Sequence, residues 1–191
     1  MPLIPTLKIG IWNAWILMSV FALQMLVVML TGKHSSDRSH VPGEAREKGL
    51  ERYTGITANY VWLLAMGYSI FLPLTLGTIQ LYTGLVLYAI GFVILTIATF
   101  NFLAAGPHHV ITVGIYRFSR HPMYLAIFLI CLGSGMASSS LLFILLSMIL
   151  AFCLYREAIV EERFCLNKYG SLYQQYLNEV PRWFGLPKKG K

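Results

Sequence analysis

The stretch HHVITVGIYRFSRHPMY, residues 108–124, is a polar interruption in a largely apolar chain. It is punctuated by glycine and proline and carries imidazole, guanidinium and phenol groups. Pro122 suits the first turn of a helix, because its missing N–H would have no partner inside the helix. Strongly apolar segments flank this stretch on both sides. The sequence therefore predicts a polar loop held between helices that lie in a membrane.

The composition also favours the membrane class. Of the 191 residues, 57% are hydrophobic and 12% are charged, whereas soluble domains carry about 25% charged residues. The mean hydropathy is +0.63. These values exclude an ordinary soluble domain, and the chain has no room for the soluble parallel sheet of a nucleotide-binding fold.

The apolar segments predict an all-α, polytopic membrane bundle of five transmembrane segments. Residues 11–30, 58–76 and 78–100 approach the roughly 20 helical residues that cross a hydrocarbon core. Residues 122–155 are uncharged but are broken near the middle by glycines and serines. We interpret them as a short helical hairpin that forms the last two segments.

The basic residues indicate the orientation. If each apolar segment crosses or re-enters once, every Lys and Arg except Lys8 falls on one side of the membrane. The positive-inside rule makes that side cytoplasmic. The N-terminus then lies outside, and the central loop and the C-terminus are cytoplasmic. We interpret the net charge of +7 mainly as a topogenic signal, with contact to anionic headgroups as the alternative.

A second polar cluster follows the last apolar segment, at residues 156–163. Glu157 and Glu161 are four residues apart and share one face of a continuing helix. A single ion pair at this spacing does not explain Glu161 and Glu162 together. From spacing alone, the simplest interpretation is a solvated amphipathic helix at the headgroups. Residues 166–176 add an aromatic stripe that predicts a C-terminal helix.

Each histidine of the central loop, taken alone, is most simply a structural residue. Several polar groups gathered beside hydrocarbon are costly, however, and such groups are usually functional. Residues 106–124 and 156–182 therefore predict a cytoplasmic pocket for a charged, amphiphilic ligand. The chain has no Walker loop, dinucleotide fingerprint or metal-ligand spacing. The reaction does not follow from spacing.

A set of motifs in a fixed order covers roughly residues 105–184 and flanks the predicted hairpin. It resembles the isoprenylcysteine carboxyl methyltransferase family, within the wider group of small integral-membrane methyltransferases that includes the phospholipid methyltransferases. The set consists of His108, Gly114, Tyr116, Arg120-His121-Pro122-x-Tyr124, Glu161-Glu162, Tyr169-Gly170, Tyr173, Tyr176 and Val180-Pro181-Arg182.

The resemblance implies an S-adenosylmethionine-dependent methyltransferase that releases S-adenosylhomocysteine. Residues 1–103 would form an N-terminal three-span region, and residues 104–191 would form the catalytic region of the same integrated domain. One of the two glutamates would hold the ammonium group of the cofactor, and Arg156 would position an acceptor carboxylate. The cofactor-binding residues implied are His108, Val110, Gly114, Tyr116, His121, Pro122, Tyr124, Glu161 and Glu162.

Direct methyl transfer needs alignment and desolvation more than a strong base, so no catalytic dyad is expected. The acceptor stays open: a prenylcysteine carboxylate, another lipid, or a small hydrophobic thiol or amine. Membrane lipid is an expected partner, whereas metal and nucleic acid are not. An NADPH-dependent intramembrane reductase of the sterol reductase type would need a basic set for the 2′-phosphate. A membrane scaffold or small transporter would need polar residues along the spans.

Overall fold

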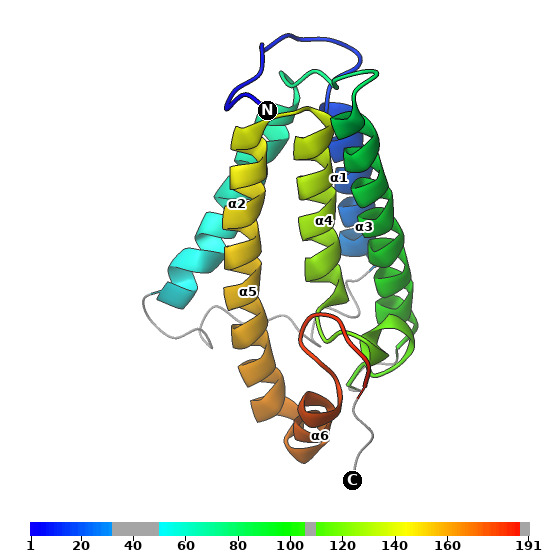
Figure 1. The fold of residues 1–191 in the computed structure, drawn as a ribbon. Helices are drawn as coiled ribbons and strands as arrows, with labels where there is room; N and C mark the ends of the chain where they lie inside the picture. Colours follow the sequence, from blue (N-terminus) through cyan, green and yellow to red (C-terminus); the bar gives the residue numbers. More distant parts are fainter. Residues whose placement is uncertain (32–49, 106–109, 188–191) are drawn as a thin grey trace.

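A computed structural model describes residues 1–31, 50–105 and 110–187 of the chain, which form a helical bundle (Figure 1). These residues contain no β-strand, only an isolated bridge between Asn13 and Pro73. The all-α prediction is therefore confirmed. The helices are α1 (Trp15–Thr31), α2 (Leu50–Ser69), α3 (Ile79–Ala104), α4 (Pro122–Ala137), α5 (Leu141–Tyr169) and α6 (Ser171–Glu179), with a 3-10 turn at Gly114–Arg117.

Two of the described helices are long and apolar enough to cross a membrane. These are α3, with 26 residues, and α5, with 29 residues. The described residues also include two shorter apolar helices, Trp15–Val27 and Pro122–Ala137. By length and composition, α3 and α5 are the candidate membrane-spanning helices, and the count of five crossings stays a prediction.

Two helices differ from the predicted segments. α2 ends at Ser69 rather than continuing to residue 76, because Pro73 lacks a backbone N–H and disfavours helix before it. The backbone carbonyls of Phe71 and Leu72 instead accept hydrogen bonds from the N-terminal segment. α5 is a long helix rather than a short hairpin arm, since it continues through the polar cluster to Tyr169.

Glycines allow α3 and α4 to pack closely. A Cβ added to Gly133 on α4 would lie 2.6 Å from both the carbonyl oxygen of Gly84 and the backbone nitrogen of Tyr88 on α3. Small residues let helices approach in lipid, where packing rather than the hydrophobic effect drives association. This contact holds the end of α4 against the first part of α3, and the close approach of Gly91 to the Ala126 carbonyl holds the two helices together nearer the polar loop.

We expect Gly133→Val to destabilise the protein by about 1–3 kcal/mol, the usual cost of overpacking a close contact. The measurement is thermal unfolding in detergent. Gly67→Val on α2 is the matched control, because a Cβ at Gly67 meets no atom within 4 Å. Equal melting temperatures for the two variants would contradict the close α3–α4 contact.

Candidate functional site

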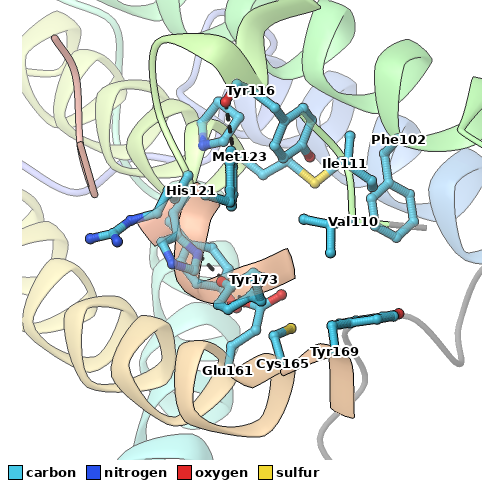
Figure 2. A pocket seen from close by; sticks show the side chains of 14 residues that line it. Phe102, Val110, Ile111, Tyr116, His121, Met123, Glu161, Cys165, Tyr169 and Tyr173 are labelled. Atoms are coloured by element: carbon cyan, nitrogen blue, oxygen red, sulfur yellow. Dashed lines mark hydrogen bonds and ion pairs between the residues drawn. The ribbon is translucent and has the colours of Figure 1, made fainter. Parts of the chain in front are cut away.

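A cavity lies at the end of the bundle where the loop before α4 meets α5 and α6 (Figure 2). It encloses about 210 Å³, and most of its wall is apolar or aromatic. An apolar cavity with a few convergent polar groups is the usual form of a small-molecule site. The lining residues are Phe102, Val110, Ile111, Tyr116, Arg120, His121, Pro122, Met123, Tyr124, Glu161, Cys165, Tyr169, Tyr173 and Tyr176.

A second cavity of about 500 Å³ adjoins the first on its α6 side. The two share Val110, Tyr169 and Tyr176 in their walls. The second cavity also carries charged groups, Arg117 and Glu179. A ligand too large for the first cavity therefore has adjoining space next to these shared residues.

The structure brings most of the predicted cofactor-binding residues to one cavity. Gly114 and Glu162 do not line it, and neither does Arg156. His108 lies outside the described residues. Those that line the cavity are Val110, Tyr116, His121, Pro122, Tyr124 and Glu161.

Gly114 shapes the loop rather than the cavity wall. Its φ of 60° is in the left-handed region that favours glycine. A Cβ here would overlap the side-chain oxygen of Asn101. That oxygen accepts a hydrogen bond of 2.9 Å from the backbone N–H of Ile115. Asn101, near the end of α3, thus fixes the turn that leads into the cavity, and only glycine fits beside it.

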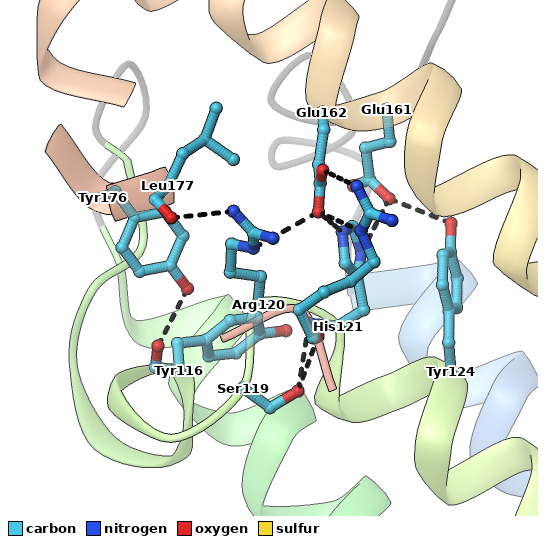
Figure 3. A network of polar contacts seen from close by, with 10 residues as sticks. Tyr116, Ser119, Arg120, His121, Tyr124, Glu161, Glu162, Tyr176 and Leu177 are labelled. Atoms are coloured by element: carbon cyan, nitrogen blue, oxygen red, sulfur yellow. Dashed lines mark hydrogen bonds and ion pairs between the residues drawn. The ribbon is translucent and has the colours of Figure 1, made fainter. Parts of the chain in front are cut away.

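Glu162 is the centre of a buried ion-pair network (Figure 3). Arg182 donates two hydrogen bonds to its carboxylate, of 3.0 Å from Nε to Oε1 and 2.7 Å from a terminal nitrogen to Oε2. His121 Nε2 lies 3.1 Å from Oε1. Arg120 Nε lies 3.3 Å from Oε1, close enough for an ion pair but not aligned as a hydrogen bond. The network ties the loop, α5 and the C-terminal tail together.

Glu161 faces the cavity instead. Its Oε2 accepts a hydrogen bond of 3.0 Å from the Tyr124 hydroxyl and lies 3.5 Å from Nδ1 of His121. Glu162 is only 7% exposed, and both of its oxygens already face cations. Of the two adjacent carboxylates, Glu161 is therefore the one that a ligand in the cavity can reach.

His121 links the two glutamates. Its ring stacks on Tyr124, with 5.3 Å between the ring centroids, and each ring nitrogen faces a carboxylate. Burial lowers the pKa of His121, but the hydrogen bonds and charges of Glu161 and Glu162 outweigh it and raise the pKa above the ordinary value. A protonated ring can donate to both carboxylates, whereas a neutral ring can donate to one.

The raised pKa of His121 predicts a stability that depends on pH. The folded-state pKa lies above the unfolded value of about 6.5, so this stabilisation is complete below that value and is lost as pH rises through the folded pKa. We expect the melting temperature to fall over that range, and the fall to be smaller in His121→Gln. Identical pH profiles for the two proteins would show that His121 is not protonated in the folded state.

The cavity phenols are neutral hydrogen-bonding groups. Burial raises the pKa of Tyr116, Tyr173 and Tyr176 well above the usual range. The Tyr176 hydroxyl donates a hydrogen bond of 2.8 Å to the backbone carbonyl of Tyr116. No group of three or more metal-ligating side chains occurs in the described part of the chain. The described wall thus supplies aromatic faces and a carboxylate rather than a phenolate base.

Part of the wall was missed from the sequence. α5 presents Glu161, Cys165 and Tyr169 to the cavity at intervals of four residues, and extending the helical face of Glu161 would have found the other two. Apolar residues at a helix end, such as Phe102 and Met123, or in the adjoining loop, such as Ile111, look the same as packing residues and gave no signal. Arg120, Tyr173 and Tyr176 belonged to the quoted motifs and to the ranges predicted to form a pocket, but none of them was predicted individually to bind the cofactor.

Most of the motif residues and most of the cavity wall lie within a stretch that matches a recognised family. The phospholipid methyltransferase family model matches residues 72–171, more than half of the chain. The protein-S-isoprenylcysteine O-methyltransferase of Schizosaccharomyces pombe is 32% identical over 81 residues, which are 42% of this chain and 34% of that protein. The match thus spans about a third of that relative's length. No solved structure matches the chain. This protein belongs to the phospholipid methyltransferase family, the wider group that its motifs indicate.

Proposed function

We propose that this protein is an integral-membrane methyltransferase that uses S-adenosylmethionine and acts on a lipophilic acceptor. The observation that carries the proposal is that Glu161 places a carboxylate in the wall of an aromatic cavity. Glu161 also lies inside the stretch that matches the phospholipid methyltransferase family. When bound, S-adenosylmethionine supplies an electrophilic methyl group on a sulfonium and leaves as S-adenosylhomocysteine. The residues fit such a group, because cations are attracted to carboxylates and to aromatic faces.

Each residue of the wall has a distinct role in this proposal. Glu161 holds the ammonium group of the cofactor, and Tyr124 and His121 fix the direction of its carboxylate. Tyr116 and Tyr173 offer ring faces and exclude water, which favours transfer between closely aligned atoms. The adjoining cavity provides room for the part of the cofactor that the first cavity does not hold.

We further propose that the acceptor carries a carboxylate on a lipophilic chain, as an isoprenylcysteine does. Arg156 directly follows the uncharged residues 122–155, and its buried Nε has no hydrogen-bond partner among the described residues. It would hold the acceptor carboxylate. A carboxylate is already nucleophilic at neutral pH, so this acceptor needs no base. A cavity whose phenols are neutral is therefore compatible with it. A lipid amine is the alternative acceptor, and it would need a group to remove a proton.

The proposal includes the predicted topology of five segments with a cytoplasmic site. The start of α4, the polar half of α5 and α6 lie at one end of the bundle, and the N-terminus lies at the other (Figure 1). This arrangement agrees with an odd number of crossings. The N-terminus would then be outside, and the cavity would open to the cytoplasm, from which a polar cofactor arrives.

The first test is calorimetry on the purified protein in detergent. We expect S-adenosylhomocysteine to bind and NADPH not to bind. Transfer of a labelled methyl group from S-adenosylmethionine to a farnesylated cysteine, with phosphatidylethanolamine in parallel, then identifies the acceptor class. Binding of NADPH alone would overturn the proposal and favour an intramembrane reductase.

Glu161→Gln should weaken S-adenosylhomocysteine binding by about 10- to 100-fold, since a hydrogen bond to a charged group contributes roughly 1.5–3 kcal/mol. Glu157→Gln is the control, because Glu157 lies one turn earlier on α5 and does not line the cavity. Equal affinities in the two variants would remove Glu161 as the ammonium ligand.

A further inference from the structure

The tail after α6 returns to the start of α4. We call residues 181–187 the strap. Its backbone carbonyls at Pro181 and Arg182 accept hydrogen bonds from the backbone N–H groups of Arg120, at 3.1 Å, and His121, at 3.3 Å. The backbone N–H of Gly185 donates one of 3.0 Å to the carbonyl of Phe118. Figure 1 shows the strap as a red loop beside the lower end of α4. The strap is thus bound to the loop that shapes the cavity.

Trp183 shows where along the bundle axis the strap lies. Its ring stacks on Tyr155, with 6.1 Å between centroids, and lies 6.3 Å from the ring of His121. Tyr155 is the last residue of the uncharged segment 122–155, and His121 directly precedes that segment. Trp183 therefore contacts both ends of the hairpin where polar sequence gives way to apolar sequence. That is where tryptophan gathers in membrane proteins.

The side chains that follow Trp183 are large, apolar and uncovered. Phe184 is 74% exposed and Leu186 is 83% exposed. The sequence then continues with Lys188 and Lys189, and lysines beside a cytoplasmic leaflet are attracted to anionic headgroups. Single exposed apolar residues are ordinary on a soluble surface. Here Phe184 and Leu186 lie next to Trp183, at the boundary between polar and apolar sequence, and this position favours lipid as their cover.

We propose that the strap docks into the headgroup–acyl boundary of the cytoplasmic leaflet through Phe184 and Leu186, and that this contact orders the cavity. The same short segment carries Arg182, which pairs with Glu162, and Trp183, which contacts His121. Lipid that fixes Phe184 and Leu186 in place therefore also fixes Arg182 and Trp183. These two residues contact Glu162 and His121 beside the cavity. The inference rests on the proposed membrane orientation and not on the reaction.

The depth of the strap can be measured by quenching. In a protein with Trp12, Trp15 and Trp62 replaced by phenylalanine, Trp183 is the remaining reporter. We expect strong quenching in phosphatidylcholine vesicles whose acyl chains carry bromine near the headgroup. The control adds Trp183→Phe and Leu172→Trp, because Leu172 is 70% exposed but follows Tyr155 by a stretch of α5 about 20 Å long at 1.5 Å per residue. Equal quenching at the two positions would overturn the proposal.

The coupling to the cavity is a separate measurement. In phosphatidylcholine vesicles, Phe184→Ser combined with Leu186→Ser should weaken S-adenosylhomocysteine binding several-fold and reduce the quenching of Trp183. Gln174→Ser should change neither, because Gln174 on α6 is exposed and lines neither cavity. A double variant that binds as tightly as Gln174→Ser would refute the coupling. If the unsubstituted protein binds no S-adenosylhomocysteine, the proposed function fails, whereas the quenching result still tests the docking of the strap.

Discussion

Glu162→Leu should destabilise the protein by about 3–5 kcal/mol, the range typical when one member of a buried charge cluster is removed. The substitution leaves Arg182, Arg120 and His121 without the carboxylate they surround. The side chains of Arg120 and His121 are only 11% and 5% exposed, so little water can reach them to replace the missing anion. The measurement is the free energy of unfolding in detergent. Cofactor affinity should fall with it, because the same network holds the loop that lines the cavity.

Arg182→Leu provides the matched comparison, since Arg182 is the most exposed cation of the network. Alone it should cost less than Glu162→Leu. In the double variant the loss should be smaller than the sum of the single losses, because the two groups share an interaction. Additive losses would mean that the Arg182–Glu162 pair seen in the structure contributes nothing, and that Glu162 acts through His121 or Arg120 alone.

The different environments of Glu161 and Glu162 illustrate what a sequence can establish. The adjacent carboxylates and the surrounding motifs were sufficient to predict that this point of α5 belongs to a site. Adjacent helical residues point in directions about 100° apart, so one of them can face the cavity while the other faces the tail. Which of the two glutamates faces the cavity depends on the rotation of α5 about its axis and on where the C-terminal tail places Arg182. Neither follows from local spacing.

The fold, like the site, could be predicted from the sequence only in part. Uncharged runs predicted the apolar helices, whereas Gly170, with a φ of 59°, ends α5 and divides the predicted helical stripe at residues 166–176 between α5 and α6. Helix bounds were less certain where hydropathy was the main guide. α2 begins at Leu50, in polar sequence, and stops before Pro73. Hydropathy identifies the part of a helix that lies in lipid, whereas the backbone hydrogen bonds that fix its ends include contacts with distant segments such as Ala14 with Leu72.

Gly114→Ala should reduce S-adenosylhomocysteine affinity by about 100-fold while leaving the helical content unchanged. A left-handed conformation costs a non-glycine residue roughly 1–2 kcal/mol. The added Cβ also displaces Asn101, and the hydrogen bond to the Ile115 N–H that this loses contributes about 1 kcal/mol. The loop can relax in the free protein, so ligand binding has to restore the native turn, and the cost appears as lost affinity.

Gly170→Ala separates these two causes. Gly170 has nearly the same φ, 59°, but a Cβ there meets no atom within 4 Å. It should therefore incur the backbone cost alone, at a position outside the cavity wall, and its S-adenosylhomocysteine affinity should stay close to that of the unsubstituted protein. If Gly114→Ala binds as tightly as Gly170→Ala, the turn held by Asn101 is not required for the ligand. If both lose affinity equally, the effect comes from general backbone strain rather than from the overlap with Asn101.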